Sequence, residues 1–334
     1  MDIPEGNILL TGATGFLGFR ILERLVENRF PGKIIASGRI LKPGAEISAD
    51  NVHYILGDLS DPQYVESLFV QGEISYVIHC AALSSPWGKY EEFFKANVLP
   101  QQSLVGISEK HKIRRFVHIS TPSLYFDFYN RLGIKESDPL PHKFVNHYAA
   151  TKREAEILLE KSNLEWISLR PRALVGRGDT VIMPRVIRAY DEGKLRIIGD
   201  GKNVVDITPV SNVVDAVMLS LTAGEAACGK KYNIANGAPV QLWDVLRDVL
   251  RRLDRNLPDK KVPLSVAMAA ATVMEVTARW LFANREPALT RYSVGTIGLS
   301  FSMDILLAQK NLGYNPRQSV EEAISEFVEW YKNQ

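Results

Sequence analysis

The strongest constraint on the fold is the alternation of short apolar runs with helical stretches along the first two-thirds of the chain. The expected strands, rich in β-branched residues, are Ile8–Thr11, Ile34–Ser37, Val52–Leu56, Tyr76–Cys80, Phe116–Ser120 and Trp166–Arg170. Between them, helices are expected at Phe16–Glu27, Pro62–Phe69, Glu91–Glu109 and His147–Lys161. This alternation predicts right-handed βαβ crossovers and a parallel sheet, whose strands are apolar because they are buried on both faces.

After Arg170-Pro171 the pattern changes. Leu195–Ile198 and Val204–Val210 flank the turn Gly199-Asp-Gly201, which predicts a hairpin or a strand pair. Further helices are expected at Val181–Tyr190 and Asn212–Leu221, and a small mixed region from residue 254 onward. We therefore expect an α/β fold: a doubly wound parallel Rossmann sheet (residues 1–175 and 203–236) and a smaller mixed α/β C-terminal substrate-binding domain (residues 176–202 and 237–334).

The composition fits a globular chain with a full core. Of 334 residues, 46% are hydrophobic and 23% are charged. The 40 Lys and Arg against 38 Asp and Glu leave a net charge of +2, which gives no surplus of cations for binding nucleic acid nonspecifically. Two cysteines fit a reducing compartment, and the acidic start with Asp2 and Glu5 does not match a secretory signal. A cytoplasmic protein without a nucleic-acid partner is expected.

One apolar stretch, Leu264–Phe282, raises the question of membrane contact. Glu275 and Arg279 interrupt it, and its uninterrupted part is shorter than the ~20 residues that a membrane span needs. We expect no integral span. The stretch predicts a helix with a large apolar surface, either a wall or lid of a pocket or an ordinary core helix.

A glycine-rich loop follows the first expected strand directly. Gly12, Gly15 and Gly18 are spaced G-x-x-G-x-x-G, one residue wider than the common dinucleotide-binding pattern. Glycines at these places allow a tight turn, close approach of the backbone to a pyrophosphate, and packing of the next helix on the strand. That helix offers unpaired N–H groups and the positive end of its dipole. A dinucleotide site is therefore predicted, which also includes the loop residues Thr14, Phe16 and Leu17.

The end of the second expected strand indicates which dinucleotide is bound. NAD-binding folds place an acid on the ribose about 20 residues after the glycines. Here the chain reads Ser37-Gly38-Arg39, with no acid before Glu46. The guanidinium of Arg39 would pair with a 2′-phosphate through charge-assisted hydrogen bonds. NADP(H) is therefore favoured, with NAD(H) as the alternative.

The segment Tyr148-Ala-Ala-Thr-Lys152 places a phenol and an ammonium on one face of an expected helix. We expect the ammonium to lower the pKa of Tyr148, so that the phenol can act as a general acid or base for alcohol and ketone interconversion. A preceding strand ends in Ser120-Thr121, whose hydroxyls could hold a substrate oxygen.

A second copy of the pattern occurs at Tyr190-Asp-Glu-Gly-Lys194. We reject it because Gly193 ends the expected helix and leaves Lys194 beyond it. No strand ending in Ser or Thr precedes this copy.

Taken in order, the glycine loop, the Ser120-Thr121 strand end and the Tyr148–Lys152 helix resemble the extended short-chain dehydrogenase/reductase family, also called the NAD-dependent epimerase/dehydratase family. The resemblance runs nearly end to end and includes Ala96-Asn97-Val98 and Leu312-Gly-Tyr-Asn-Pro316. It implies the catalytic residues Thr121, Tyr148, Lys152 and Asn97. It implies further cofactor contacts at Asp58, Leu59, Ala81, Ala82, Lys152, Pro171 and Leu174. At the family's Tyr-Gly pair this chain has Tyr125-Phe126, so the usual glycine is missing.

Two departures from the family pattern narrow the branch. Pro122-Ser123 follows Thr121 where family dehydratases carry Asp-Glu. Val205 stands where nucleotide-sugar enzymes carry an arginine that reads the substrate diphosphate. The stretch Asn203–Asn212 instead resembles the 3β-hydroxysteroid dehydrogenase-like branch, which includes 2-alkyl-3-oxoalkanoate reductases. This branch implies a hydrophobic substrate, with contacts predicted at Ser123, Leu83 and Met183.

These observations predict an NADP(H)-preferring oxidoreductase that interconverts a secondary alcohol and a ketone on a sterol-like or 3-oxoacyl-like substrate. Tyr148 would protonate the substrate oxygen, Thr121 would hydrogen-bond it, and Lys152 would bind the nicotinamide ribose. The alternatives are an NAD-dependent nucleotide-sugar 4-epimerase and a non-catalytic NADP(H)-sensing protein. Six scattered histidines have no metal-ligand spacing, so no metal is expected. The family resemblance also implies a homodimer formed by residues 91–109 and 147–161.

Overall fold

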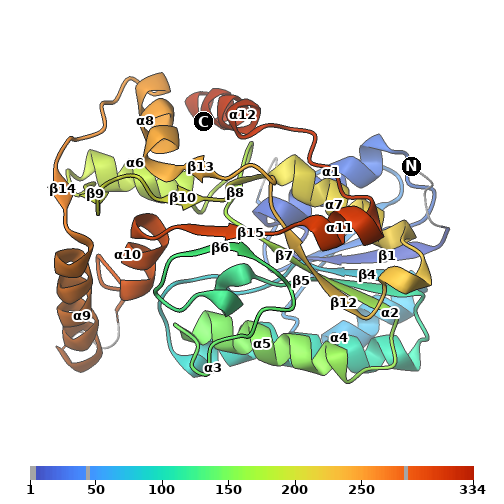
Figure 1. Ribbon diagram of the computed structural model, residues 1–334. Helices are drawn as coiled ribbons and strands as arrows, with labels where there is room; N and C mark the ends of the chain where they lie inside the picture. The colour runs from blue at the N-terminus through green and yellow to red at the C-terminus, as the bar shows by residue number, and fades with distance from the viewer. Residues whose placement is uncertain (1–4, 43–45, 282–284) are drawn as a thin grey trace.

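A seven-stranded parallel sheet runs through the larger part of the molecule, which we describe from a computed structural model covering residues 5–42, 46–281 and 285–334 (Figure 1). The strand order is β12-β7-β5-β4-β1-β2-β3. The strands are β1 (Asn7–Thr11), β2 (Ile34–Gly38), β3 (Val52–Leu56), β4 (Ile74–His79), β5 (Arg115–Ile119), β7 (Trp166–Pro171) and β12 (Lys230–Ile234). The first six lie where the apolar runs predicted them. The doubly wound α/β fold is confirmed.

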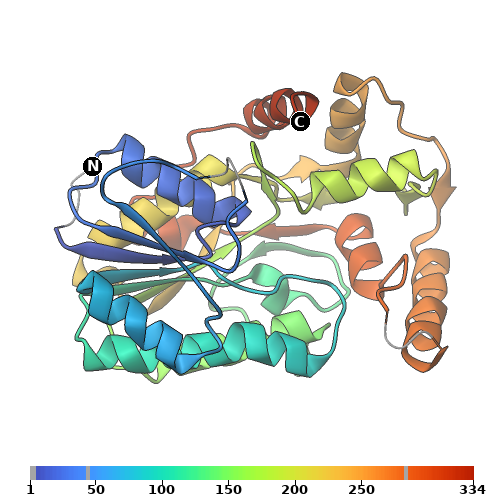
Figure 2. The ribbon, with the colours of Figure 1, turned by 180° about the vertical axis from the view of Figure 1, so that it is seen from behind.

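Helices cover both faces of this sheet (Figures 1 and 2). One face packs on α1 (Phe16–Glu27), α7 (Val210–Thr222) and α11 (Leu306–Leu312), and the other on α2 (Pro62–Gly72), α4 (Leu99–Lys110) and α5 (His147–Glu160). Successive strand residues point to opposite faces. In β1, therefore, Ile8 and Leu10 join the first core and Leu9 joins the second.

The face toward α4 and α5 becomes polar near the carboxyl ends of the strands. Two residues after Leu9, the same face of β1 carries Thr11, and the neighbouring strands carry His79 and His118 there. Arg170 of β7 is also buried at this end. Burial of this many polar groups requires partners within the protein. Thr11 and His79 hydrogen-bond each other, whereas His118 and Arg170 are bonded by side chains of α5.

The helix expected at Glu91–Glu109 is interrupted. It consists of α3 (Tyr90–Phe93), a π-helical turn over Phe94–Val98, and α4. Pro100 lies in the first turn of α4 and has no N–H to donate to the preceding turn, which breaks the regular ladder at this point. The wider turn contains Asn97, and such turns are frequent at functional sites.

The smaller mixed α/β part lies at one end of the sheet (Figure 1). Its helices are α6 (Met183–Asp191), α8 (Leu242–Arg252), α9 (Leu264–Leu281), α10 (Arg291–Gly298) and α12 (Val320–Lys332). Its main sheet has the order β13 (Val240–Gln241), β10 (Val204–Val205), β15 (Phe301–Met303) and β6 (Arg131–Ile134). The pairs β8 (Leu174–Val175) with β11 (Thr208–Pro209) and β9 (Ile197–Ile198) with β14 (Lys261–Val262) complete it.

The prediction of a hairpin or a strand pair around Gly199-Asp-Gly201 is wrong. The strand before the turn, β9, pairs with β14, whereas the strand after it, β10, pairs with β13 and β15. The loop satisfies its own backbone locally, because Asp200 accepts a hydrogen bond from the N–H of Lys202 at 2.9 Å. The two strands are thus free to pair with distant segments, which a local sequence pattern does not reveal.

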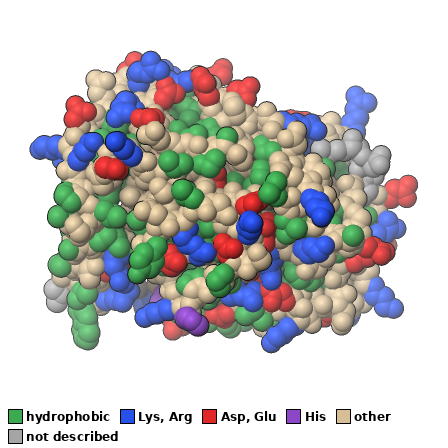
Figure 3. Space-filling view, viewed as in Figure 1, with side chains coloured by type: hydrophobic (Ala, Val, Ile, Leu, Met, Phe, Trp, Pro, Cys, Tyr) green, Lys and Arg blue, Asp and Glu red, His purple; other side chains and the backbone are tan. Residues whose placement is uncertain are grey.

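The apolar stretch at Leu264–Phe282 forms α9, and Phe282 lies outside the described residues. Ala267 and Ala271 pack in the core of the smaller part, so one face of the helix is a core face. Its opposite face exposes Val273 and Trp280, the latter to 82%, and apolar side chains gather over this end of the molecule in Figure 3. No helix in the described part of the chain is long and apolar enough to cross a membrane.

A buried ion pair joins the sheet to α5 and predicts a large stability effect. Nη2 of Arg170 lies 2.6 Å from Oε2 of Glu156, and both side chains are almost fully buried. Glu156→Ala leaves the guanidinium buried without its anion, so we expect the free energy of unfolding in urea to fall by about 3–5 kcal/mol.

Glu160→Ala is the matched control. Glu160 lies one turn further along α5 and pairs with Arg153 while a quarter of its side chain is exposed. Its loss should cost about 1 kcal/mol or less. Equal losses for the two variants would contradict a special role for the buried pair.

Candidate active site

The glycine loop forms a cradle at the carboxyl end of β1, where the strand order of the sheet reverses. Gly12 has a positive φ of 71°, and a Cβ there would lie 2.8 Å from the backbone nitrogen of Ala81. A Cβ at Gly18 would lie 2.1 Å from the Gly12 carbonyl oxygen. Gly15 caps α1 without a side chain, which leaves the first N–H groups of the helix available to an anion. This backbone surface fits the pyrophosphate of a dinucleotide.

The other predicted loop residues lie around this cradle. A Cβ at Gly38 would meet Oγ1 of Thr14 at 2.4 Å, so Thr14 packs directly on the end of β2. The ring of Phe16 faces Gly178 in the loop that follows β8. Leu17 is partly buried against the main core. The first βα turn is therefore fixed between β2 and the smaller part of the molecule.

Arg39 and Asp58 meet at the rim of the cradle. Both are exposed and follow β2 and β3 directly, while the neighbouring Leu59 is buried. Hydrogen bonds from Ser60 hold the pKa of Asp58 below its usual range, with smaller contributions from the charges of Lys95 and Arg39. Arg39 and Asp58 therefore follow two neighbouring strands, since β2 pairs with β3.

Asn97, in the π-helical turn, connects two parts of the site. Its Oδ1 accepts a hydrogen bond from the Leu83 N–H at 2.7 Å, and its Nδ2 donates to Oγ1 of Thr151 on α5 at 3.1 Å. The side chain is only 2% exposed. It thereby fixes the segment after β4, which carries Ala81 and Ala82, relative to the helix that carries Tyr148.

A chain of hydroxyl groups surrounds Tyr148. Asn146 caps α5, which places Tyr148 in the first turn of that helix. The hydroxyls of Thr121 and Ser84 hydrogen-bond the phenol. Thr121 also donates to Oγ of Ser123 at 3.1 Å, and Ser123 shares a hydrogen bond of 2.7 Å with the hydroxyl of Tyr292. The structure thus brings Tyr148, Thr121 and Ser123 together as the sequence predicted.

The pKa of Tyr148 differs from the expectation. Burial raises it above its usual value, and the hydrogen bonds from Thr121 and Ser84 offset this only in part. The expected lowering by Lys152 does not appear, because the Lys152 ammonium is directed to other acceptors. The phenol is thus protonated at neutral pH, as a general acid must be.

Lys152 is held beneath the site by the end of β5. Its Nζ donates to the Ile119 carbonyl at 2.7 Å and lies 2.8 Å from Nε2 of His118. Burial lowers the pKa of Lys152 to about 8 and that of His118 well below its usual value. His118 is therefore neutral and can accept from the ammonium, which leaves one of the three Lys152 N–H groups for a cofactor.

The remaining predicted residues have different surroundings. Pro171 is buried at the end of β7, and Leu174 lies in β8. Leu83 is partly buried, with its backbone held by Asn97. Met183 is 2% exposed and packs in the core of the smaller part, and no described contact joins it to the hydroxyl groups around Tyr148.

Sequence reasoning missed Ser84 and Tyr292. Ser84 follows the predicted cofactor contacts Ala81 and Ala82 closely, so its position after β4 could have indicated that it lies near the site. Tyr292 comes from α10, whose start is fixed by Glu275 of α9 through hydrogen bonds to the backbone and side chain of Arg291 at 2.7 and 2.9 Å. Nothing local in the sequence connects Tyr292 with Tyr148.

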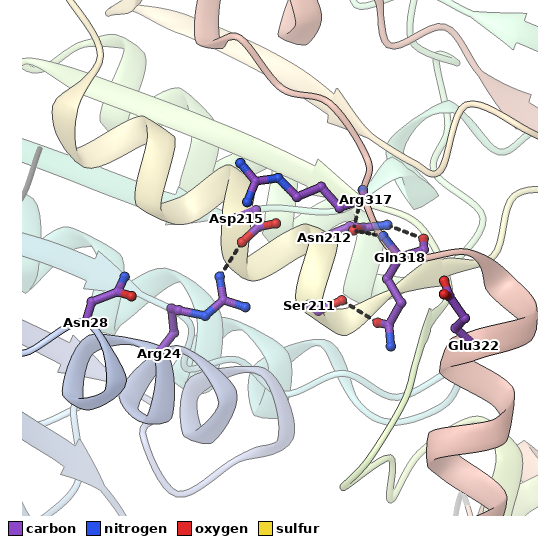
Figure 4. A pocket seen from close by; sticks show the side chains of 8 residues that line it. All are labelled: Arg24, Asn28, Ser211, Asn212, Asp215, Arg317, Gln318 and Glu322. Atoms are coloured by element: carbon purple, nitrogen blue, oxygen red, sulfur yellow. Dashed lines mark hydrogen bonds and ion pairs between the residues drawn. The ribbon is translucent and has the colours of Figure 1, made fainter. Parts of the chain in front are cut away.

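The structure also has a polar hollow that none of the predicted site residues lines. This hollow of about 570 Å³ lies between α1, α7 and the start of α12 (Figure 4). It is lined by Arg24, Asn28, Ser211, Asn212, Asp215, Arg317, Gln318 and Glu322. Across the described residues, no cluster of three or more His, Cys, Asp or Glu side chains is arranged to hold a metal ion. Burial raises the pKa of Cys80 to about 12, which leaves its thiol unreactive.

Comparison with known proteins identifies the family of the chain. The model of the NAD dependent epimerase/dehydratase family matches residues 8–235. The chain therefore belongs to this family. It is 32% identical to a 2-alkyl-3-oxoalkanoate reductase of Stenotrophomonas maltophilia, over 95% of this chain and 97% of the relative. It is 29% identical to a 3beta-hydroxysteroid-dehydrogenase/decarboxylase of Arabidopsis thaliana, over 100% of this chain and 82% of the relative.

A solved structure shows the same fold. The Bordetella bronchiseptica enzyme WbmH in complex with NAD+ superimposes with a TM-score of 0.78, covering 99% of each chain. The two sequences are 17% identical, so this likeness concerns the fold alone.

The tight approach of Gly12 to Ala81 predicts that cofactor binding depends on the absence of a side chain. Gly12→Ala introduces a Cβ into a left-handed turn and against backbone, so we expect dinucleotide affinity to fall at least tenfold in a fluorescence titration.

Gly106→Ala on α4 serves as the control, because a Cβ there meets nothing within 4 Å. It should leave affinity unchanged and stabilise the protein by up to about 1 kcal/mol. Unchanged affinity in Gly12→Ala would contradict the assignment of the cradle.

Proposed function

We propose that this protein is an NADP(H)-preferring oxidoreductase that interconverts a secondary alcohol and a ketone on a hydrophobic substrate. The chain is an NAD(P)-dependent enzyme by its family, and its named relatives are reductases and dehydrogenases. The observation that carries the proposal is the position of the Tyr148 phenol in the first turn of α5, beside the hydroxyls of Thr121 and Ser84.

The residues divide the reduction between them. The bound nicotinamide supplies a hydride to the carbonyl carbon when the ketone is reduced. Tyr148 donates its proton to the carbonyl oxygen, and Thr121 donates a hydrogen bond that stabilises the charge developing there. Lys152 offers its remaining N–H to the cofactor and holds a positive charge beneath it. In the reverse direction, Tyr148 must first lose its proton, so oxidation should require a higher pH than reduction.

Aromatic side chains beside the hydroxyl chain support a hydrophobic substrate. The ring of Phe126 contacts those of Tyr292 and Phe301, with centroids 5.7 and 5.9 Å apart. On another side, the Arg279 guanidinium lies over the ring of Trp87, so α9 contacts the segment after β4 that carries Ser84. The relatives named for oxoalkanoates and hydroxysteroids act on apolar molecules of this kind.

The two alternatives fit less well. A nucleotide-sugar 4-epimerase needs a cation for the diphosphate, and Val205 is instead 3% exposed and paired on both sides within β10. A sensor that only binds NADP(H) has no use for a phenol surrounded by hydroxyl donors. We therefore retain the oxidoreductase.

The acid–base assignment predicts that Tyr148→Phe keeps the fold and cofactor binding, because only a hydroxyl is removed. Turnover of a hydrophobic 3-oxo or 3-hydroxy substrate, followed through absorbance of the reduced cofactor, should fall by about 10²–10⁴-fold. Because the pKa of Tyr148 is raised, the rate of alcohol oxidation should still be increasing near pH 10.

Tyr190→Phe is the matched control. Its hydroxyl only accepts a hydrogen bond from the N–H of Asn256 at 3.2 Å. Turnover should be nearly unchanged. A loss of activity in Tyr190→Phe and not in Tyr148→Phe would overturn the site, and epimerisation of a UDP-hexose at an enzymatic rate would favour the first alternative.

The cofactor preference rests on Arg39. Removal of one charge-assisted phosphate contact costs roughly 1.5–3 kcal/mol, so Arg39→Ala should weaken NADPH binding about tenfold or more and NADH binding little. Lys33→Ala removes a cation from the opposite end of β2 and should affect neither cofactor. Equal weakening of both cofactors by Arg39→Ala, or a wild-type preference for NADH, would contradict the NADP(H) assignment.

A further inference from the structure

Arg172 is a buried cation without an anion. It follows β7 directly, and its backbone N–H is bonded to the Ile234 carbonyl at 3.1 Å. The side chain is 9% exposed, and its guanidinium lies 4.6 Å from the centre of the Phe301 ring. Within the described part of the chain, no group accepts a hydrogen bond from this guanidinium, and its Nε is completely buried.

This arrangement differs from that of the neighbouring arginine. Arg170 is also buried, but Glu156 accepts two hydrogen bonds from it, at 2.6 and 2.8 Å. Buried charges in proteins are normally paired, because an unpaired charge loses its hydration without compensation. The contact with Phe301 supplies only a modest part of that compensation. Among the described residues, no carboxylate therefore forms an ion pair or hydrogen bond with Arg172, although the charge of Asp206 acts on it.

The charge of Asp206 acts on Arg172, but the two side chains form no ion pair in the described part of the chain. Its Oδ2 accepts a hydrogen bond from the Met303 N–H at 2.7 Å, and its Oδ1 is buried without a partner. Asp206 faces the strand β15, which leaves the Nη groups of Arg172 free to bind a ligand.

The position of Arg172 connects it with the catalytic hydroxyls through Tyr292. Arg172 lies over the ring of Phe301, and the ring of Phe126 contacts both Phe301 and Tyr292. The Tyr292 hydroxyl is bonded to Ser123, which is bonded to Thr121. One small molecule held by Thr121 and Tyr148 through its carbonyl oxygen can therefore present a second polar group to Arg172.

We propose that Arg172 binds the carboxylate of the substrate, so that the enzyme acts on 3-oxo or 3-hydroxy carboxylic acids with a hydrophobic chain. This inference rests on the proposed function and specifies its substrate class. A guanidinium binds a carboxylate through two parallel hydrogen bonds, which fixes the orientation of the acid as well as its place. In a 3-oxo acid only one carbon separates the carboxyl group from the carbonyl, so this binding turns the carbonyl toward Tyr148. The relative from Stenotrophomonas maltophilia is named for such an acid.

The test compares a 2-alkyl-3-hydroxyalkanoate with its methyl ester, which has the same chain without the charge. Oxidation with NADP+ is followed, because the hydroxy acid is stable whereas 3-oxo acids lose carbon dioxide in solution. The wild type should prefer the acid. Arg172→Gln should lower kcat/KM for the acid about tenfold to hundredfold and leave that for the ester unchanged. Arg172→Lys, which keeps the charge without the planar fork, should give an intermediate value.

Arg247→Gln on the exposed face of α8 is the charge-matched control and should change neither value. If Arg172→Gln does not fold, the Lys variant and the wild-type preference between acid and ester still decide the matter. Equal use of acid and ester by the wild type, or an equal loss for both in Arg172→Gln, would overturn the proposal and make Arg172 a structural residue, while the oxidoreductase function would stand.

Calorimetric titration of the cofactor-saturated protein with the same two compounds separates the two proposals. Binding of the acid that Arg172→Gln weakens, without any hydride transfer, would support the carboxylate site and overturn the proposed function. Failure of the acid to bind more tightly than the ester would overturn the carboxylate site, whatever the catalytic result.

Discussion

Parallel strands end at a common edge, and this constraint determines where the chemistry of the protein lies. Because the residues of a strand alternate between faces, Thr11, His79, His118 and Arg170 all point to the side covered by α5. This face of the sheet is polar only at the carboxyl ends of the strands, which lie against Lys152 and Glu156 of α5. The glycine loop leaves the same edge. Most of these groups are hydrogen-bonded, Thr11 with His79, His118 with Lys152 and Arg170 with Glu156.

One side of the site is held by buried contacts to α5, and the other side is formed by helices of the C-terminal part of the chain. Asn97 and the Arg170–Glu156 pair fix the segments after β4 and β7 to α5, through contacts buried from solvent. The opposite wall depends on α10, which is held by α9 through Glu275. The residues around Tyr148 therefore come from both parts of the chain: Thr121 and Ser123 follow β5 of the central sheet, and Tyr292 belongs to α10.

The features that the sequence predicted well are local ones. Six strands, α1 and the cradle at Gly12 follow from short-range pattern and from the conformations that glycine allows. The strand β12 was not predicted, because it lies at an edge and begins with two lysines. Ser84, Arg172 and Tyr292 were also missed, since their roles come from contacts between distant segments. The pKa of Tyr148 moved opposite to expectation because helical spacing places Lys152 on the same face but does not determine which acceptors its ammonium meets.

The hydrogen bond between Ser123 and Tyr292 joins two segments that lie 169 residues apart in the sequence. Ser123 follows a strand of the central sheet, whereas Tyr292 belongs to a helix anchored on α9. Any displacement of α9 and α10 from the sheet must lengthen this contact and alter the hydroxyl chain that ends at the Tyr148 phenol. The position of the Tyr292 hydroxyl beside Ser123, and so the arrangement of hydroxyls around Tyr148, therefore depends on how α9 and α10 pack against the central sheet.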